Sequence, residues 1–371
     1  MSPESFQYLL NVVGPIISKK NTNLRKAISA SERLCLTLHY LAYGGIQQSL
    51  SFSFRIAKST ICNIINETCL AIWNSLNEQY LRPPKTADDW KCISQGFNEI
   101  WNLPHCIGAI DGKHIAIKAP LNSGSLYYNY KGFFSMILMA ICDARYVFTL
   151  VDIGSYGSNN DSGVFRNSSM EKAFFNEEMG LPAPDHLNNA PQFGRVPYFL
   201  VGDEAFPLPP WLLRPYPGQG IPEDKVIFNY RLSTARRVIE NAFGILAARW
   251  RVFMQPIQSS VEKTDLIVKA TICLPNFLRQ TNSAGYCPAG FADSWDETGN
   301  IKEGEWRNII GERQGVMLKN NIAPVRGSRP LASALEVRNV VNSYVNSLEG
   351  SVPWQWDHVR SRGIVLNTSN E

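Results

Sequence analysis

Four short apolar runs in the middle of the chain constrain its fold more than any other feature. They read CIGAI, SMILMAIC, YVFTLVDIG and PYFLVG, and each is bounded by Gly, Asp, Asn or Pro. Short apolar runs that end in turn-forming residues are typical of buried β-strands. Helical stretches separate some of these runs. This alternation predicts an α/β core with a mixed sheet flanked by helices.

The 371 residues suggest two or three domains rather than one. Residues 1–85 have helical patterns, including SERLCLTLHYLAYGG, for which we expect Ser31 as the N-cap and a C-terminal end at Gly44. Pro83 and Pro84 then interrupt the helical pattern. Residues 86–280 carry the apolar runs. Residues 281–371 are polar and rich in Gly and Pro, which predicts a loosely packed extension with one helix near ALEVRNVVNSYVNSL.

Two consecutive helices in the N-terminal region have the layout of a helix-turn-helix. The stretch SLSFSFRIAKSTICNIINETC breaks near Ile56–Lys58, and its second helix opens with polar residues. A recognition helix would turn these residues toward DNA; many helix pairs inside protein cores share the same layout. The residues predicted to face outward and contact DNA are Lys58, Ser59, Thr60 and Asn63, and those predicted to face inward are Ile61, Ile64 and Ile65.

The charge of the chain is modest overall but unevenly distributed. The formal net charge is +4, and six Lys or Arg residues and a single acid lie between Lys225 and Arg251. Such a cluster suits a phosphate backbone, and a solvated basic surface is the alternative. The eight cysteines form no C-x-x-C pair, which argues against a zinc or redox motif. Without a signal peptide or an apolar run long enough to span a membrane, we expect a reducing, intracellular compartment.

Three acids are placed where a metal site could form. Asp111 and Asp203 each follow an apolar run, and the ends of strands are where α/β proteins build their sites. Glu240 lies off the apolar stripe of the helix predicted over 236–253, next to Gly244, whose lack of a side chain would let another group approach. Three carboxylates together suit a hard cation such as Mg²⁺ or Mn²⁺. Taken singly, Asp111 fits a simple turn and Glu240 a surface ion pair with an arginine.

Long stretches of the sequence resemble a known family. They are CIGAIDGKHIAIKAP, YYNYKGFFSMILMAICDA, NDSGVF, VGDEAFPL, LLRPYP and IFNYRLSTARRVIENAFGILAARWRVF, together with the two N-terminal helical stretches quoted above. They resemble the PIF/Harbinger superfamily of DDE transposases and their domesticated nuclease relatives. The resemblance implies a ribonuclease H-like fold and a metal-dependent DNA nuclease with Asp111, Asp203 and Glu240 as its catalytic, metal-binding triad. Asp161 matches an additional metal ligand of some relatives, and a helix N-cap is the alternative for it.

The resemblance also bears on partners and location. It implies that DNA is the substrate, that a separate Myb/SANT-like protein supplies DNA recognition and nuclear import, and that the chain acts in the nucleus, with the cytoplasm as a second location. A catalytically inactive DNA-binding or chromatin-associated protein is the alternative function. Pro275 stands where the family has a His, which predicts a shortened helix, and Ser162 replaces the usual Gly. The sequence leaves open whether the chain forms homo-oligomers and whether an N-terminal piece is missing.

Several side chains near the triad carry a second set of predictions. Lys113, Arg236 and Arg237 are predicted phosphate contacts, with ordinary surface charge as the alternative. His114 either orients substrate or has a structural role. The aromatic residues of the run from 127 to 133 are expected to pack against one another rather than to stack on unpaired bases.

Overall fold

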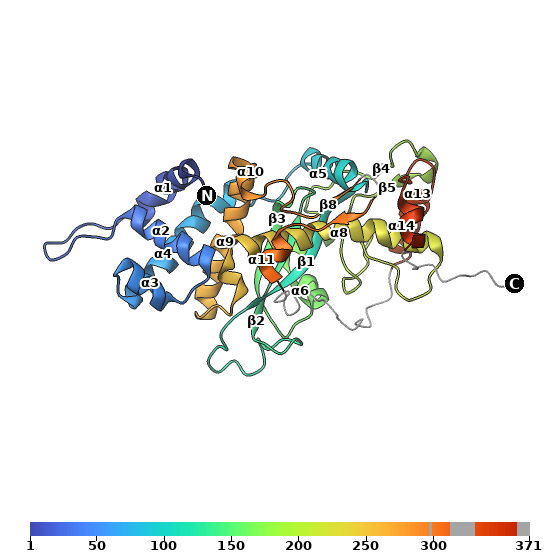
Figure 1. Cartoon of the computed structure of the whole chain (residues 1–371). Coiled ribbons are helices and arrows are strands. Elements are labelled where there is room, and N and C mark those ends of the chain that lie inside the picture. The colour runs from blue at the N-terminus through green and yellow to red at the C-terminus, as the bar shows by residue number, and fades with distance from the viewer. Residues whose placement is uncertain (297–298, 312–330, 362–371) are drawn as a thin grey trace.

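A five-stranded mixed sheet forms the centre of the computed structural model, which describes residues 1–296, 299–311 and 331–361 (Figure 1). Its strands, in spatial order, are β3 (Phe148–Tyr156), β2 (Ser135–Cys142), β1 (Cys106–Ala116), β6 (Phe199–Val201) and β7 (Leu212–Leu213). β1, β2 and β3 are antiparallel, whereas β6 runs parallel to both β1 and β7. Each of the four apolar runs contains a strand, so the prediction of an α/β core with a mixed sheet is confirmed.

The two faces of the sheet are covered by different helices. Side chains of β2 alternate between two apolar clusters, as the period of a strand requires: Met136, Leu138 and Ala140 join one, and Ile137, Met139 and Ile141 join the other. The larger cluster includes residues of two long helices, and the smaller one includes residues of two short helices. These four helices are α8 (Glu223–Arg249) and α9 (Val261–Thr281), and α6 (Asp161–Asn167) and α7 (Ser169–Phe175).

The first four helices of the chain pack together at one end of the molecule (Figure 1). They are α1 (Pro3–Ile17), α2 (Ala30–Tyr43), α3 (Gln47–Phe54) and α4 (Lys58–Tyr80). The N-cap of α2 is Ser29, whose side chain accepts from the Glu32 N–H, so the prediction of Ser31 is wrong. Gly44 ends α2 in the left-handed region, as expected, and a Cβ there would lie 2.2 Å from the carbonyl oxygen of Arg251.

The predicted faces of the α3–α4 pair are as expected. In the first turns of α4, Lys58, Ser59 and Asn63 are exposed and Thr60 is half-buried. Ile61, Ile64 and Ile65 are buried. The orientation of these side chains agrees with a helix-turn-helix and equally with a helical bundle. DNA binding by α4 therefore stays a prediction.

Two long helices depart from the sequence-based expectations. α8 begins well before Arg236 and ends at Arg249, with a short 3₁₀ helix, η2 (Arg251–Met254), after it. α9 continues through Pro275 instead of ending there, so the prediction of a shortened helix is wrong. The Asn276 side chain donates to the carbonyl oxygens of Tyr80 and Phe148, both at 2.7 Å, and these bonds hold the helix beyond the proline.

The C-terminal extension packs closely against α8 where the structure describes it. Trp306 is fully buried, and a Cβ on Gly244 of α8 would lie 2.3 Å from its ring. The elements of this part are α10 (Ser283–Tyr286), β8 (Ser294–Trp295), β9 (Ile301–Lys302), α11 (Trp306–Ile310), α13 (Ala332–Val345) and α14 (Gln355–Ser361). The prediction of a loosely packed extension is therefore wrong where α11, α13 and α14 pack on α8, whereas residues 297–298, 312–330 and 362–371 lie outside the described residues.

The remaining elements connect these layers. They are α5 (Ala87–Trp101), β4 (Asp185–His186), the 3₁₀ helix η1 (Pro191–Phe193) and β5 (Arg195–Val196). Thr86 caps α5 through a capping box with Asp89, directly after the predicted break at Pro83 and Pro84. All eight cysteines are free thiols. None of the helices within the described residues is long and apolar enough to cross a membrane.

Candidate active site

Asp111 lies inside β1, and Asp203 follows the end of the neighbouring parallel strand β6 by two residues. Ala109 of β1 pairs with Val201 of β6, and each aspartate comes two residues after its member of this pair. Side chains two residues apart on a strand share a face, so Asp111 lies on the same face of β1 as Ala109, and the charge of Asp203 acts on it from the end of β6. Asp111 is buried inside β1 and does not follow the strand as predicted, because β1 continues to Ala116 in its pairing with β2. Its Oδ1 accepts from the Gly112 N–H at 2.9 Å.

Asp161 approaches Asp111 from a different element. It is the first residue of α6, and the cap is Asn160, whose Oδ1 accepts from the Gly163 N–H at 2.6 Å. The N-cap alternative for Asp161 is therefore wrong. Its side chain is buried, and a Cβ on Gly112 would lie 2.2 Å from its Oδ1. A glycine at 112 thus lets the Asp161 carboxylate reach the backbone beside Asp111.

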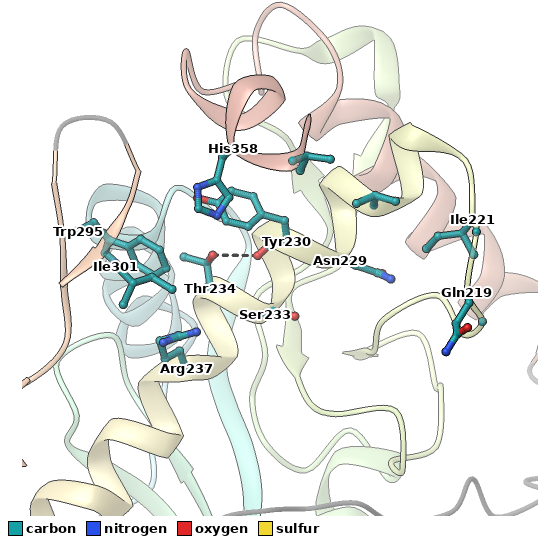
Figure 2. A pocket seen from close by; sticks show the side chains of 14 residues that line it. Gln219, Ile221, Asn229, Tyr230, Ser233, Thr234, Arg237, Trp295, Ile301 and His358 are labelled. Carbon is teal, nitrogen blue, oxygen red and sulfur yellow. Dashed lines mark hydrogen bonds between the residues drawn. The ribbon is translucent and has the colours of Figure 1, made fainter. Parts of the chain in front are cut away.

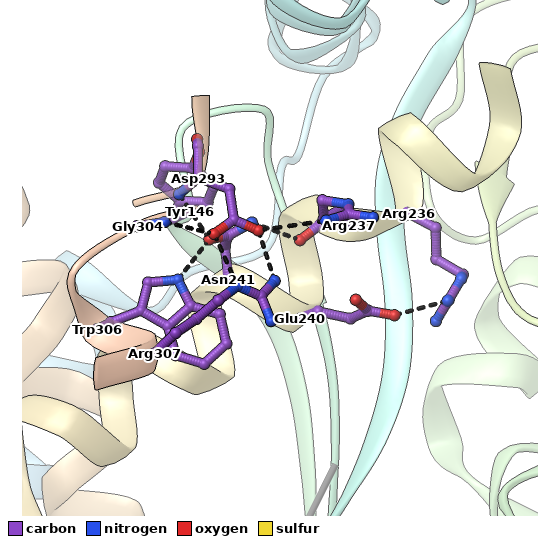
Figure 3. Close-up of polar contacts among 9 residues, drawn as sticks. All are labelled: Tyr146, Arg236, Arg237, Glu240, Asn241, Asp293, Gly304, Trp306 and Arg307. Carbon is purple, nitrogen blue, oxygen red and sulfur yellow. Dashed lines mark hydrogen bonds and ion pairs between the residues drawn. The ribbon is translucent and has the colours of Figure 1, made fainter. Parts of the chain in front are cut away.

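Glu240 lies on α8 and is paired with Arg236. The Arg236 Nη2 and Glu240 Oε1 are 2.6 Å apart, so the helical ion pair considered from the sequence is present (Figure 3). Arg236 also interacts with the aspartates. Burial opposes its charge, yet the negative charges of Glu240, Asp111 and Asp203 raise its pKa above the ordinary value. Arg236 therefore acts as a shared counter-charge between Glu240 and the two strand aspartates.

The three aspartates repel one another in a buried setting. Burial raises the pKa of Asp111 well above its ordinary range, and the charges of Asp203 and Asp161 add to this effect. Burial and Asp203 raise the pKa of Asp161 to about 7. The pKa of Asp203 is also raised, mainly by burial, although Arg236 opposes the shift. A divalent cation would relieve this repulsion, because it stabilises the charged carboxylates.

The carboxylate oxygens of these acids are suitable ligands for a hard cation, but the side chains are too far apart to bind one ion together. Carboxylate oxygens are the ligands that Mg²⁺ and Mn²⁺ prefer. The Asp161 Oδ1 is buried and makes no hydrogen bond within the part of the chain that the structure describes. Over the same residues, no three His, Cys, Asp or Glu side chains converge closely enough to hold an ion as they stand. Asp111, Asp161 and Asp203 are thus the residues that could hold a cation, with Glu240 engaged by Arg236.

Comparison with known proteins identifies the family and the relatives that this chain resembles. The DDE superfamily endonuclease family matches residues 110–276, which include all four acids. A protein named ALP1-like from Arabidopsis thaliana is 29% identical over 264 residues, covering 68% of this chain and 62% of its own. HARBI1 of Homo sapiens, named as a candidate nuclease, is 27% identical over 274 residues, 72% of each chain. This chain belongs to the Harbinger family of DDE transposase-derived proteins.

The match to these relatives is partial in length. The aligned part spans about three fifths of the ALP1-like protein and under three quarters of HARBI1. A further Arabidopsis thaliana relative, named antagonist of like heterochromatin protein 1, is 26% identical over 326 residues, covering 84% of this chain and 81% of its own. No solved structure matches the chain significantly.

Two residues of the β1–β2 connection face the acids of this Harbinger-family protein, and the sequence analysis did not select them as charged site residues. Asp161 and Asp111 stabilise the charged form of Lys131, although burial lowers its pKa overall. Burial raises the pKa of Tyr130 to about 12, and Asp161, Asp111 and Asp203 contribute. The Lys131 ammonium lies 5.5 Å from the centre of the Tyr130 ring. The signal that could have found Lys131 is its place in the quoted stretch YYNYKGFF.

The other aromatic side chains of the connection pack against rings. Tyr127 contacts Tyr156 with ring centroids 5.0 Å apart, and Tyr128 contacts Phe134 at 5.2 Å. Phe133 lies 6.4 Å from His114. Packing therefore accounts for Tyr127 and Phe133, whereas Tyr128 and Tyr130 are 48% and 53% exposed, so the expected packing role holds for only part of the run.

Three predicted side chains have contacts inside the protein. Lys113 is buried with its ammonium 5.7 Å from the Phe243 ring centre, and burial lowers its pKa to about 8. This position argues against the predicted phosphate contact of Lys113. His114 is buried with Nδ1 2.9 Å from the Ser135 Oγ, which favours its structural role. Arg237 is partly exposed and turns toward Asp293, with Nη1 3.6 Å from Oδ2 (Figure 3).

Proposed function

We propose that this chain is a divalent-metal-dependent DNA nuclease of the transposase type, with Asp111, Asp203 and Glu240 as its catalytic acids and Asp161 as a further metal ligand. The observation that carries the proposal is the group formed by the buried Asp111 and Asp161 and the half-buried Asp203. Burial raises the pKa of all three, and the charge of Asp203 adds to the shift at Asp111 and Asp161. Such a group is costly without a cation. The match to the DDE superfamily endonuclease family supports the same assignment.

The sheet topology supports a ribonuclease H-like fold. Three antiparallel strands are followed by two shorter strands parallel to β1, in the order β3-β2-β1-β6-β7. This order places the end of β6 beside the middle of β1, close to Asp111. The acids then face α8, which packs on β1 and β2. A helix that crosses the sheet at this place can deliver a third carboxylate.

The acids and the basic residues have different proposed roles in the cleavage of a phosphodiester bond. A bound pair of Mg²⁺ or Mn²⁺ ions would activate the attacking hydroxyl or water and stabilise the leaving oxygen. A cation at Glu240 would share this carboxylate with Arg236, whose Nη2 lies 2.6 Å from Oε1. Arg236 is proposed to bind a DNA phosphate beside the acids. Lys131 offers a second positive charge near Asp161 and Asp111.

DNA is proposed to be held by further basic and polar residues and by a partner protein. Lys58, Ser59, Thr60 and Asn63 on α4, together with Arg236 and Arg237 on α8, are the proposed contacts. The resemblance stated above further suggests a Myb/SANT-like partner and a nuclear location. A second candidate function, a chromatin-associated protein without catalysis, is suggested by the name of the Arabidopsis thaliana relative that is 26% identical over 326 residues, antagonist of like heterochromatin protein 1.

Cleavage of DNA in the presence of Mn²⁺ tests the proposal. Supercoiled plasmid DNA should be nicked by the wild type and not by Asp203→Asn. Asp152→Asn is the matched control, because Asp152 lies on β3 and only burial raises its pKa. Mn²⁺ should also raise the melting temperature of the wild type more than that of Asp203→Asn, since ligand binding stabilises the native state. Equal cleavage or an equal thermal gain in both proteins would remove Asp203 from the site.

A further inference from the structure

A cavity of about 530 Å³ lies beside α8 where the C-terminal segment packs against it (Figure 2). One wall is α8 itself, with Tyr230, Ser233 and Arg237. The other wall comes from Trp295 of β8 and Ile301 of β9, with His358 of α14 above Tyr230. Cavities of this size that combine rings with a few polar groups are typical of sites for small organic molecules.

The lining of the cavity suits a flat, negatively charged ligand. The rings of Tyr230 and His358 have centroids 4.5 Å apart, and the Arg237 guanidinium lies 5.8 Å from the centre of the Trp295 ring. The Trp295 Nε1 is buried and makes no hydrogen bond among the residues that the structure describes. The described residues of the lining include no Asp or Glu. Aromatic faces bind bases by stacking, and a nearby cation binds the phosphate.

The cavity lies on the same stripe of α8 as Glu240. Lining residues recur at steps of three and four, Val226, Tyr230, Ser233 and Arg237, and the next step is Glu240. With a rise of 1.5 Å per residue, Arg237 is about 4.5 Å and Tyr230 about 15 Å from Glu240 along the helix axis. One DNA strand advances about 3.4 Å per nucleotide in a duplex. A DNA strand that ran along α8 would therefore place the cavity about one to four nucleotides from Glu240.

A buried polar network fixes the outer wall before any ligand arrives (Figure 3). The Asp293 carboxylate accepts from the Gly304 N–H at 2.9 Å and from the Arg307 Nε at 3.0 Å. The Asp293 N–H donates to the Asn241 Oδ1 at 3.0 Å, which ties the segment to α8 one residue after Glu240. Trp295 follows Asp293 by two residues. The Trp295 ring is thus held beside α8, so ligand binding would lose little conformational entropy in ordering this side chain.

We propose that this cavity, the base pocket, takes one unpaired nucleobase of the DNA strand whose phosphodiester lies at the acids, with an adjacent phosphate on Arg237. The inference rests on the proposed function in taking DNA as the ligand. It goes beyond that function in assigning the base pocket to an unstacked base. Unpairing near the cut position would then be stabilised by Trp295 and Tyr230.

Binding of two oligonucleotides to the full chain tests the base pocket. The probes are a fluorescein-labelled single strand and the same strand with several consecutive abasic sites, measured by anisotropy with Ca²⁺ present. The wild type should bind the complete strand at least about 5-fold more tightly, because stacking favours each bound base. Trp295→Ala should lower this preference to within about 2-fold and leave the affinity for the abasic strand unchanged.

Two further variants separate the pocket from folding and from general charge. Ser233→Phe places a ring in the cavity from an exposed position of α8 and should abolish the preference without removing a wall. Phe175→Ala removes an exposed ring at the end of α7 and should keep the full preference. Equal binding of both strands by the wild type, or an unchanged preference in Ser233→Phe, overturns the inference. A preference without Mn²⁺-dependent cleavage supports the pocket and refutes the nuclease, and a wild type that binds no DNA refutes both.

Discussion

Asp293→Asn should destabilise the protein by about 3 kcal/mol, at the lower end of the range for breaking a buried ion pair. The Asp293 side chain is 0% exposed, whereas Arg307 and Arg237 are 21% and 27% exposed. The asparagine can still accept one hydrogen bond, but its NH₂ group would face a guanidinium that only donates. Because both arginines can recover part of their hydration, the loss should not reach the upper end of that range.

Urea unfolding followed by tryptophan fluorescence measures this loss, since Trp295 and Trp306 flank Asp293. Glu99→Gln is the matched control: it removes one negative charge from an exposed position of α5 and should cost under about 0.5 kcal/mol. A loss in Asp293→Asn as small as that of the control would refute the reasoning, because Asp293 would then behave as a surface charge.

The pH dependence gives an independent check on the same residue. Burial alone would raise the pKa of Asp293, but Arg307, the Gly304 N–H and Arg237 outweigh burial and lower the pKa below its ordinary value. The folded pKa is therefore below the unfolded one. The stabilisation is complete above the unfolded value of about 3.9 and is lost as the pH falls through the folded pKa. The wild type and Asp293→Asn should thus converge in stability under strongly acidic conditions.

Three further predictions follow from the described contacts. Gly244→Ala puts a methyl group 2.3 Å from the Trp306 ring; overpacking of about 1–3 kcal/mol should exceed the helix-propensity gain of about 1 kcal/mol, and a raised melting temperature would contradict this. Burial lowers the pKa of His114 to about 4, so up to roughly 3 kcal/mol of stability, complete above about pH 6.5, should be lost as the pH falls toward 4; His114→Gln should flatten that part of the curve, and an unchanged curve would exclude His114 as its cause. Lys58→Ala should weaken binding to all DNA sequences and flatten the salt dependence, whereas Asn63→Ala should relax preference at one base position; identical effects in competition binding would argue against α4 as a recognition helix.

The parts of the fold that depend on local pattern could be predicted from the sequence. The four apolar strands and the break between α3 and α4 are each determined by a short run of consecutive residues, so the local pattern predicts them. β7, Leu212–Leu213, is too short to give such a pattern. The packing of Trp306 on Gly244 joins residues far apart in the chain, so the glycine indicated only that something approaches.

The candidate site was predictable to a similar degree. The family resemblance selected the acids, but their environment depends on long-range contacts. The approach of Asp161 to Gly112 and the position of Lys131 opposite the acids follow from how α6 and the β1–β2 connection fold over the sheet. The burial of Lys113 follows from the packing of α8 against β1, which places Phe243 beside its ammonium. A charged residue in a strand gives no local sign of which layer will cover it.

The contact between Asp293 and α8 has a consequence for the order in which the protein is made. All four acids precede Asn241 in the chain, whereas the groups that hold Asp293 against α8 extend to Arg307. A nascent chain that has emerged only as far as α9 carries every acid but lacks this support for the helix that presents Glu240. We therefore expect the acids to reach their final arrangement only after synthesis has passed Arg307.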